Sequence, residues 1–189
     1  MSLNYVLASG SSHKKTLLER LKIDFEIRTP DIDESQQVFE SPENLVQRLS
    51  KEKAWTVLEN REELIISSDQ LAVYNGIVEG KPLTRERNIE QLERFSGQTV
   101  IFLTGLHVTR SDKRLAREKI VNTEVKFRQL SLSEIERYVN NEPAYDCTGG
   151  FKAEGLGITL MESITSDDPT AIVGLPLIAL SRFLKELDI

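Results

Sequence analysis

The chain has 189 residues, which is enough for one domain with a substantial hydrophobic core. Hydrophobic residues make up 39% and charged residues 29%, which excludes a disordered chain, and the formal net charge of −6 argues against a nucleic-acid-binding surface driven by bulk positive charge. The single cysteine excludes an internal disulfide and a cysteine-rich zinc site. The sequence contains no apolar stretch near the ~18 residues of a membrane span and no signal peptide. We therefore expect a cytoplasmic protein that does not bind a membrane.

The first 60 residues predict two strands and two helices. A short strand over residues 5–8 is broken by the turn formers of residues 9–12, and leucines at helical spacing then predict a helix that starts near His13 or Lys14. A half-buried strand is expected over residues 25–29, followed by an acidic loop. Serine and proline at the end of that loop, Ser41-Pro42, mark the start of a second helix, which we expect to run towards residue 60.

The middle of the chain opens on the apolar run Leu64-Ile65-Ile66, which predicts a buried strand with Asp69 at its carboxyl end. A turn over residues 74–76 predicts a hairpin, after which Lys81 could return to the same end of the sheet. Capping, alternation and glycine signals predict the remaining elements, in chain order: a helix capped by Thr84 and ended by Gly97, two long strands over 100–108 and 120–127 joined by a charged tip at 111–114, a helix with a Ser131–Glu134 capping box that stops before Pro143, a glycine-dense segment over 149–157, a strand over 158–164, and a final helix from 175–177 to 187.

This order of elements predicts the fold class. Strands alternate with helices early, and a long antiparallel pair follows, so we expect an α/β fold with a mixed twisted sheet. Residues 1–189 would form a single domain with two lobes, one of residues 1–83 plus 142–189 and the other of residues 84–141.

Asp69 and Lys81 are the first candidates for chemistry. An acid at the carboxyl end of a strand lies where open α/β sheets place their ligands, and a carboxylate with an ammonium group suits phosphate chemistry. The same residues are explained equally well by a solvent-exposed acid at a strand end and an unrelated lysine in a loop. This stretch alone therefore leaves both interpretations open.

Ser9, Ser11 and Lys14 lie between a predicted strand and the start of a predicted helix. The free N–H groups and the dipole of a helix N-terminus attract anions, and the hydroxyl and ammonium groups would add donors. A serine-rich turn with capping serines and exposed lysines is the simpler alternative, and the residues alone favour it.

Three acids from separate segments, Glu34, Asp69 and Glu154, could serve a metal-dependent hydrolase. Such an enzyme needs one or two carboxylates on Mg²⁺ and a base that activates water. Surface charge is the alternative, because the chain has 30 Asp and Glu residues. Neither histidine falls in a zinc-ligand spacing, so we expect His107 to be a core or edge residue, and Cys147 to be a small buried residue.

Short motifs occur in a fixed order along nearly the whole chain. They are residues 7–11, Lys14-Lys15, Asp33-Glu34, Lys53-Ala54, Ser68-Asp69-Gln70, Gly80-Lys81-Pro82, residues 149–155 and residues 174–177. Together these motifs resemble the Maf family of nucleotide pyrophosphatases. Gln70, Glu154 and the run over 157–160 are similar to the branch of that family that acts on 7-methyl-GTP. The chain departs from the family at Lys14, where arginine is usual, and at His13, where that branch carries tryptophan.

The resemblance implies a two-lobed α/β fold around a deep cleft, similar to Ham1 and ITPase proteins. It also implies a divalent metal cation, Mg²⁺ or Mn²⁺, and cleavage of a nucleoside triphosphate into monophosphate and pyrophosphate, which would keep modified nucleotides out of nucleic acids. By position, Asp69 would be the general base and would bind the metal together with Glu34. The implied substrate-binding residues are Ser9, Ser11, His13, Lys14, Lys53, Gln70, Lys81 and Glu154, of which His13, Gln70 and Glu154 would select the base. Lys152 joins them because its glycine-dense segment allows close approach to a ligand.

The expected partner is a small-molecule nucleotide, with no nucleic acid, and self-association into a homodimer is left open. Two alternatives remain: a non-catalytic nucleotide-binding regulator of cell division, and a pyrophosphatase for other modified or pyrimidine nucleotides. A carboxylate beside the phosphates favours an enzyme, because a pure phosphate binder gains nothing from it.

Overall fold

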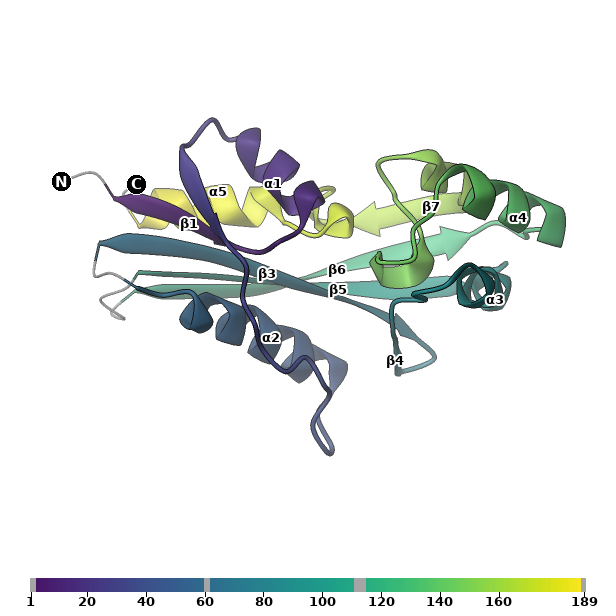
Figure 1. Ribbon diagram of the computed structural model, residues 1–189, viewed down its shortest axis with the longest axis horizontal. Coiled ribbons are helices and arrows are strands. Elements are labelled where there is room, and N and C mark those ends of the chain that lie inside the picture. Colours follow the sequence, from purple (N-terminus) through teal and green to yellow (C-terminus); the bar gives the residue numbers. More distant parts are fainter. Residues whose placement is uncertain (1–2, 60–61, 111–114, 188–189) are drawn as a thin grey trace. The chain divides into compact units, whose positions relative to one another are not determined.

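The structure is a computed structural model that describes residues 3–59, 62–110 and 115–187. Its strands form one mixed sheet in the order β2-β1-β3-β5-β6-β7, and β4 pairs with β3 (Figure 1). The expected α/β fold with a mixed sheet is therefore confirmed. The strands are β1 (Asn4–Ala8), β2 (Phe25–Arg28), β3 (Glu63–Tyr74), β4 (Ile77–Glu79), β5 (Thr99–Arg110), β6 (Ala116–Phe127) and β7 (Met161–Ser166). The helices are α1 (Ser12–Glu19), α2 (Pro42–Thr56), α3 (Arg85–Phe95), α4 (Leu132–Asn141) and α5 (Leu177–Glu186).

Internal contacts divide the chain into two compact units. β3, β5 and β6 each belong partly to both. The deep cleft and the lobes of residues 1–83 plus 142–189 and 84–141 stay predictions. The first unit contains Met1–Asp69, Thr104–Val121 and Asp168–Ile189, and the second contains Gln70–Leu103 and Asn122–Asp167.

In the first unit, β1 lies between β2 and β3 and runs parallel to both. Side chains alternate between the two faces of these strands, and different helices cover each face. Ile66 packs with Leu18 of α1 and Leu180 of α5, whereas Ile65 packs with Ala54 of α2. Figure 1 shows α1 and α5 on one side of β1 and β3 and α2 on the other. Burial on both faces explains why Val6-Leu7-Ala8 in β1 and Leu64-Ile65-Ile66 in β3 are unbroken apolar runs.

β3 is longer than the sequence predicts, and it continues well beyond Asp69, so this acid lies inside the strand and not at its carboxyl end. Polar residues follow the apolar run without ending the strand, because the hydroxyl groups of the two buried serines before Asp69 both have hydrogen-bond partners. The Ser67 hydroxyl donates to the carbonyl of Ser50 in α2. The Ser68 hydroxyl donates to the carbonyl of Gly174 at 2.6 Å. Asp69 is only 8% exposed, which excludes the interpretation as a solvent-exposed strand-end acid.

The hairpin expected after β3 is confirmed. β3 and β4 are antiparallel, with Ala72 opposite Glu79. Asn75 and Gly76 form the turn with φ angles of 51° and 78°. Two successive positive φ angles match the twist of a tight hairpin, which is why Asn-Gly suits this position.

Helix starts are confirmed where capping residues marked them. α1 begins one residue before His13, and Ser11 caps it. α2 ends at Thr56 instead of running towards residue 60, because Val57 leaves the helical conformation and is buried. The other confirmed caps are Ser41 for α2, Thr84 for α3, and the Ser131–Glu134 capping box for α4.

The strand expected over residues 158–164 is wrong in its first part. Leu156–Leu160 forms a 3-10 helix, and β7 begins only after it. The N–H of Gly157 donates to the Glu142 carboxylate at 3.1 Å, which holds this turn. Ile158 is consequently 53% exposed, although isoleucine is typical of a buried strand. The charged tip expected at 111–114 lies outside the described residues.

In the part of the chain that the structure describes, no helix is both long and apolar enough to cross a membrane.

Candidate active site

Glu34, Lys53 and Asp69 meet in the first unit. The Lys53 ammonium lies 2.5 Å from Asp69 Oδ1 and 2.7 Å from Glu34 Oε1. Lys53 and Asp69 are 9% and 8% exposed, while the Glu34 side chain is 53% exposed. Two carboxylates from distant segments therefore share one largely buried ammonium group.

The geometry of the cluster follows from the alternation of β3. Residues 65, 67 and 69 point to the same face of the strand, which is the face that α2 covers. Ile65 packs against Ala54 of α2, and the Ser67 hydroxyl bonds to the α2 backbone. Asp69 continues this row and reaches Lys53, the neighbour of Ala54.

Lys53 carries the electrostatic character of the cluster. Burial alone would lower the pKa of its ammonium, but the charges and hydrogen bonds of Asp69 and Glu34 outweigh burial and raise that pKa. Lys53 is therefore a fixed cation at neutral pH. A buried charge is tolerated here because it is paired and hydrogen-bonded.

The serine loop leaves β1 next to this cluster, because β1 runs parallel to β3. The Ser11 hydroxyl accepts from the N–H of Lys14 at 3.4 Å, and the Ser9 hydroxyl accepts from the N–H of Ser11 at 3.1 Å. Both hydroxyls thus serve the turn and the helix cap. Lys14 differs from an exposed lysine, since its ammonium donates to the Ser68 carbonyl at 2.5 Å. His13 is partly buried on the same helix.

The other candidate residues, Gln70, Lys81, Lys152 and Glu154, belong to the second unit. Gln70 follows Asp69 in β3, and Lys81 is exposed beyond β4. The N–H of Lys152 donates to the Tyr138 hydroxyl at 3.1 Å. Glu154 is exposed on the same segment as Lys152.

Buried aromatic rings and amides hold the loops of these residues. Phe151, next to Lys152, makes edge contacts with Phe102 and Phe127 at centroid distances of 5.4 and 5.5 Å. From α3, Asn88 donates to the Gly150 carbonyl at 2.9 Å. Also from α3, Gln91 donates to the Gly80 carbonyl, directly before Lys81, at 3.0 Å. One helix therefore fixes the loops that carry Lys81 and Lys152.

Glu34 and Asp69 are the residues that could hold a metal ion. Among the described residues, no group of three or more His, Cys, Asp or Glu side chains is arranged for this purpose. Two carboxylates that converge on one point still fit Mg²⁺, which takes one or two carboxylates and fills its remaining positions with water and phosphate oxygens. The donor set therefore fits an ion that arrives with a phosphate ligand.

Cys147 is half-buried, and burial raises the pKa of its thiol to about 11. A thiol of this kind is a poor nucleophile at neutral pH.

The sequence patterns above do not single out Arg48, nor the backbone carbonyl of Ser68 that accepts from Lys14. An arginine on a helix that follows an acidic loop is a usable signal for Arg48. The carbonyl of Ser68, which accepts from Lys14, leaves no signal because every residue carries the same backbone group.

A family model described as Maf-like protein matches residues 4–187. The chain is 49% identical over 181 residues to a protein of Aromatoleum aromaticum named 7-methyl-GTP pyrophosphatase, covering 95% of this chain and 93% of that protein. A protein of the same name from Pseudomonas aeruginosa is 49% identical over 183 residues, covering 96% of this chain and 95% of that protein. The solved structure of a HAM1 protein from Coxiella burnetii is 17% identical, with a TM-score of 0.48, and the match covers 68% of this chain and 75% of that chain.

Proposed function

This chain belongs to the Maf family, and from that premise we propose that it is a pyrophosphatase that hydrolyses 7-methyl-GTP to its monophosphate and pyrophosphate. The name of the relatives that are 49% identical over almost their whole length supports this substrate. The role would be to remove a modified nucleotide before it enters nucleic acid. We also propose that the enzyme acts in the cytoplasm; a homodimer stays a prediction.

The Asp69–Lys53–Glu34 cluster carries the proposal. In the proposed reaction, water attacks the α-phosphorus while Asp69 accepts a proton from it. The bond between the α-phosphorus and the bridging oxygen breaks, and pyrophosphate leaves with the electron pair. Lys53, fixed as a cation, would stabilise the charge that develops on the phosphate oxygens.

Glu34 and Asp69 would hold a divalent cation, Mg²⁺ or Mn²⁺, together with phosphate oxygens of the substrate. Such an ion supplies charge neutralisation on the phosphates. Since Lys53 bonds to the same two carboxylates, it also keeps their oxygens together before the substrate arrives.

The remaining candidates divide between the two ends of the nucleotide. We assign Glu154 to the base, because a carboxylate accepts the N1–H and amino donors of guanine and complements the positive charge of a 7-methylated ring. His13 and Gln70 stay candidates for the same task. The candidates for phosphate binding are Ser9, Ser11, Lys14, Lys81 and Lys152.

Replacement of the general base tests the proposal. We expect Asp69→Asn to lower kcat for pyrophosphate release from 7-methyl-GTP about 10²- to 10⁴-fold. The matched control is Asp24→Asn, an exposed aspartate that should leave kcat unchanged. Near-normal turnover in Asp69→Asn would refute the role of Asp69. Wild-type protein that binds nucleotides but releases no pyrophosphate with Mg²⁺ or Mn²⁺ would instead favour a non-catalytic regulator.

The substrate itself is tested by a panel of canonical and methylated nucleoside triphosphates, scored by kcat/KM. We expect 7-methyl-GTP to rank first and Glu154→Gln to reduce its advantage over GTP more than it reduces turnover. A higher kcat/KM for dTTP or UTP would contradict the proposed substrate.

A further inference from the structure

Arg48 makes an extensive set of hydrogen bonds close to the proposed active site. It lies on α2, five positions before Lys53, and its side chain is 18% exposed. Its guanidinium binds the Glu40 carboxylate with two bonds, of 2.7 Å from Nε and 3.0 Å from Nη2. Nη2 also donates to the Ser35 carbonyl at 2.9 Å, and Nη1 donates to Glu52 at 3.1 Å. This fork geometry is one that lysine cannot reproduce.

The bonds to Glu40 and Ser35 fasten the loop between β2 and α2 onto α2, whereas the bond to Glu52 lies within α2. Inside the loop, the Glu40 carboxylate also accepts from the N–H of Gln37 at 3.0 Å, and Asp33 accepts from the N–H of Ser35 at 2.9 Å. Arg48 therefore contacts both Ser35 and the residue that organises the loop's far end. Glu34 lies between Asp33 and Ser35, at the point where the loop is held.

The Glu34–Lys53 pair needs such a fastening. The Glu34 side chain is 53% exposed, and ion pairs of exposed carboxylates contribute little by themselves. Ordering a loop costs conformational entropy at every residue, of order 1–2 kcal/mol each. One half-exposed pair would not hold the loop in place, whereas the three bonds from Arg48 to Glu40 and Ser35 fix it.

We propose that Arg48 is a positioning residue, which sets Glu34 against Lys53 by holding Ser35 and Glu40 on α2. This inference rests on the proposed function, because Glu34 and Lys53 act there on the phosphates. In this role Arg48 acts through the loop, by its bonds to Ser35 and Glu40.

A double-mutant cycle separates positioning from general stabilisation. Misplacement of a group by about 1 Å costs on the order of 10²-fold, so we expect Arg48→Met to lower kcat/KM for 7-methyl-GTP about 10- to 100-fold. In a Glu34→Gln background, the same change should lower kcat/KM by less than about threefold, since Glu34 no longer contributes. Equal losses in the two backgrounds would overturn the proposal.

Arg28 offers a matched control. Its side chain is 13% exposed, and it bonds to Glu63 at 2.8 Å, to Glu26 at 2.9 Å and to the Val57 carbonyl at 3.0 Å. Arg28→Met should lower thermal stability and leave kcat/KM of the folded protein unchanged. If Arg48→Met does not fold, Arg48→Lys keeps the charge without the fork and should give a smaller loss of the same kind; full activity in Arg48→Lys would overturn the proposal.

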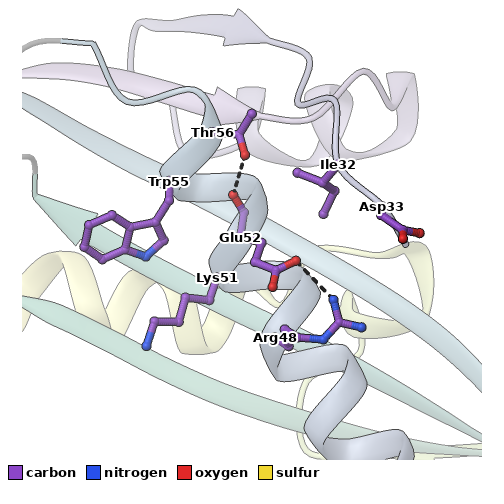
Figure 2. Close-up of a pocket in the computed structure, with 7 residues that line it drawn as sticks. All are labelled: Ile32, Asp33, Arg48, Lys51, Glu52, Trp55 and Thr56. Atoms are coloured by element: carbon purple, nitrogen blue, oxygen red, sulfur yellow. Dashed lines mark hydrogen bonds and ion pairs between the residues drawn. The ribbon is translucent and has the colours of Figure 1, made fainter. Parts of the chain in front are cut away.

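A spectroscopic measurement tests the loop without any turnover. Trp55 is the single tryptophan of the chain, and it lines an open groove of about 600 Å³ with Arg48 of α2 and with Ile32 and Asp33 of the loop (Figure 2). Release of the loop in Arg48→Met should shift Trp55 emission to longer wavelength and increase its quenching by acrylamide. Unchanged emission and quenching would overturn the proposal. If wild-type protein releases no pyrophosphate, the proposed function fails, while Trp55 still reports on the loop.

Discussion

Gly174 occupies a position where a side chain would make a tight contact with Lys14. Its φ is 110°, and a Cβ atom there would lie 3.2 Å from Lys14 Cε. Its carbonyl also accepts from the Ser68 hydroxyl. We expect Gly174→Ala to lower the free energy of unfolding by about 1–3 kcal/mol, because the backbone conformation is strained for any L side chain. Displacement of Lys14 should lower pyrophosphate release as well.

Urea unfolding measures the stability effect of Gly174→Ala. The control is Gly80→Ala, because no atom lies within 4 Å of a Cβ atom at Gly80. This control should change the free energy of unfolding by no more than about 0.5 kcal/mol. Equal effects of the two substitutions would contradict the steric account of Gly174.

His107 should make folding sensitive to acid. Burial lowers the pKa of its imidazole, and nearby Lys51 adds to this, while the bond to Glu118 opposes it without reversing the direction. Its Nε2 atom is buried, and among the described residues it has no hydrogen-bond partner. The folded state therefore accepts a proton on His107 less readily than the unfolded state does.

The sign of the pH effect follows from this difference. Above the unfolded-state pKa of about 6.5, His107 is neutral in both states and costs nothing. As the pH falls below that value, the unfolded state gains a proton first, so the free energy of unfolding decreases until the folded-state pKa is reached. Urea unfolding at pH 7.5 and 5.5 should show a smaller decrease for His107→Gln than for wild type. An equal decrease would assign the acid sensitivity to other groups.

Among the elements, α5 starts without a cap of its own, because Pro176 provides no side-chain hydrogen bond. Asp168 replaces the missing cap from a distance: its carboxylate accepts from the N–H of Ala179 at 3.0 Å and from the Thr170 hydroxyl at 2.8 Å. The same hydroxyl accepts from the N–H of Leu177 at 2.8 Å. The helix start is thus built by residues that precede it by several positions.

Removal of this remote cap should be costly. Asp168 is 2% exposed, so Asp168→Ala leaves buried donors without an acceptor, and we expect a loss of about 1–3 kcal/mol in the free energy of unfolding. The neighbouring Asp167 is exposed, and Asp167→Ala serves as the control. Thermal unfolding of both variants checks the expectation; similar melting temperatures would refute the capping role of Asp168.

Local signals predicted the elements well where a side chain bonds to its own helix or turn. Ser41, Thr84 and the Ser131–Glu134 box each marked a helix start that the structure contains. The Asn75-Gly76 turn is a similar case. Asp168 could not be predicted as a cap, because its partners are defined by packing and not by spacing.

The extent of β3 and the buried amides of α3 were unpredictable for the same reason. Serine is typical of loops, but Ser67 and Ser68 are buried in a strand. They are tolerated there because carbonyl groups from distant segments accept hydrogen bonds from their hydroxyls. Asn88 and Gln91 are residue types typical of the solvent-exposed face of a helix. Both are nevertheless buried, and their side chains donate to backbone carbonyls of loops. A polar residue can be recognised as buried only when its partner is known.

Across the molecule, the candidate site depends on segments that are far apart in the sequence. Composition and periodicity did not decide whether Asp69 and Glu34 are catalytic residues or surface charges. The structure brings both carboxylates to the Lys53 ammonium. The ordered motifs that resemble the Maf family added Lys53 to these two acids. The candidate residues could therefore be named from the sequence, while their contacts with Lys53 and the bonds of Arg48 required the structure.

The overall charge of the chain also bears on how it binds a nucleotide. The formal net charge is −6, so the molecule as a whole repels a triphosphate, and local cations must overcome this repulsion. Lys14 and Lys53 already bond to acceptors of the protein, which limits the positive charge they offer. We therefore expect binding of the substrate to depend strongly on the divalent cation.

Thermal unfolding with a non-hydrolysable analogue of 7-methyl-GTP measures this dependence. At a concentration of about 100 times Kd, the Mg²⁺ complex of the analogue should raise the free energy of unfolding by about 2.7 kcal/mol. With excess chelator, most of this increase should disappear, because Glu34 and Asp69 then face the phosphates without a cation between them. Glu34→Gln should weaken the effect of the chelator, since one of the repelling carboxylates is gone. The same stabilisation with and without Mg²⁺ would show that the lysines suffice and that the two carboxylates do not bind the ion.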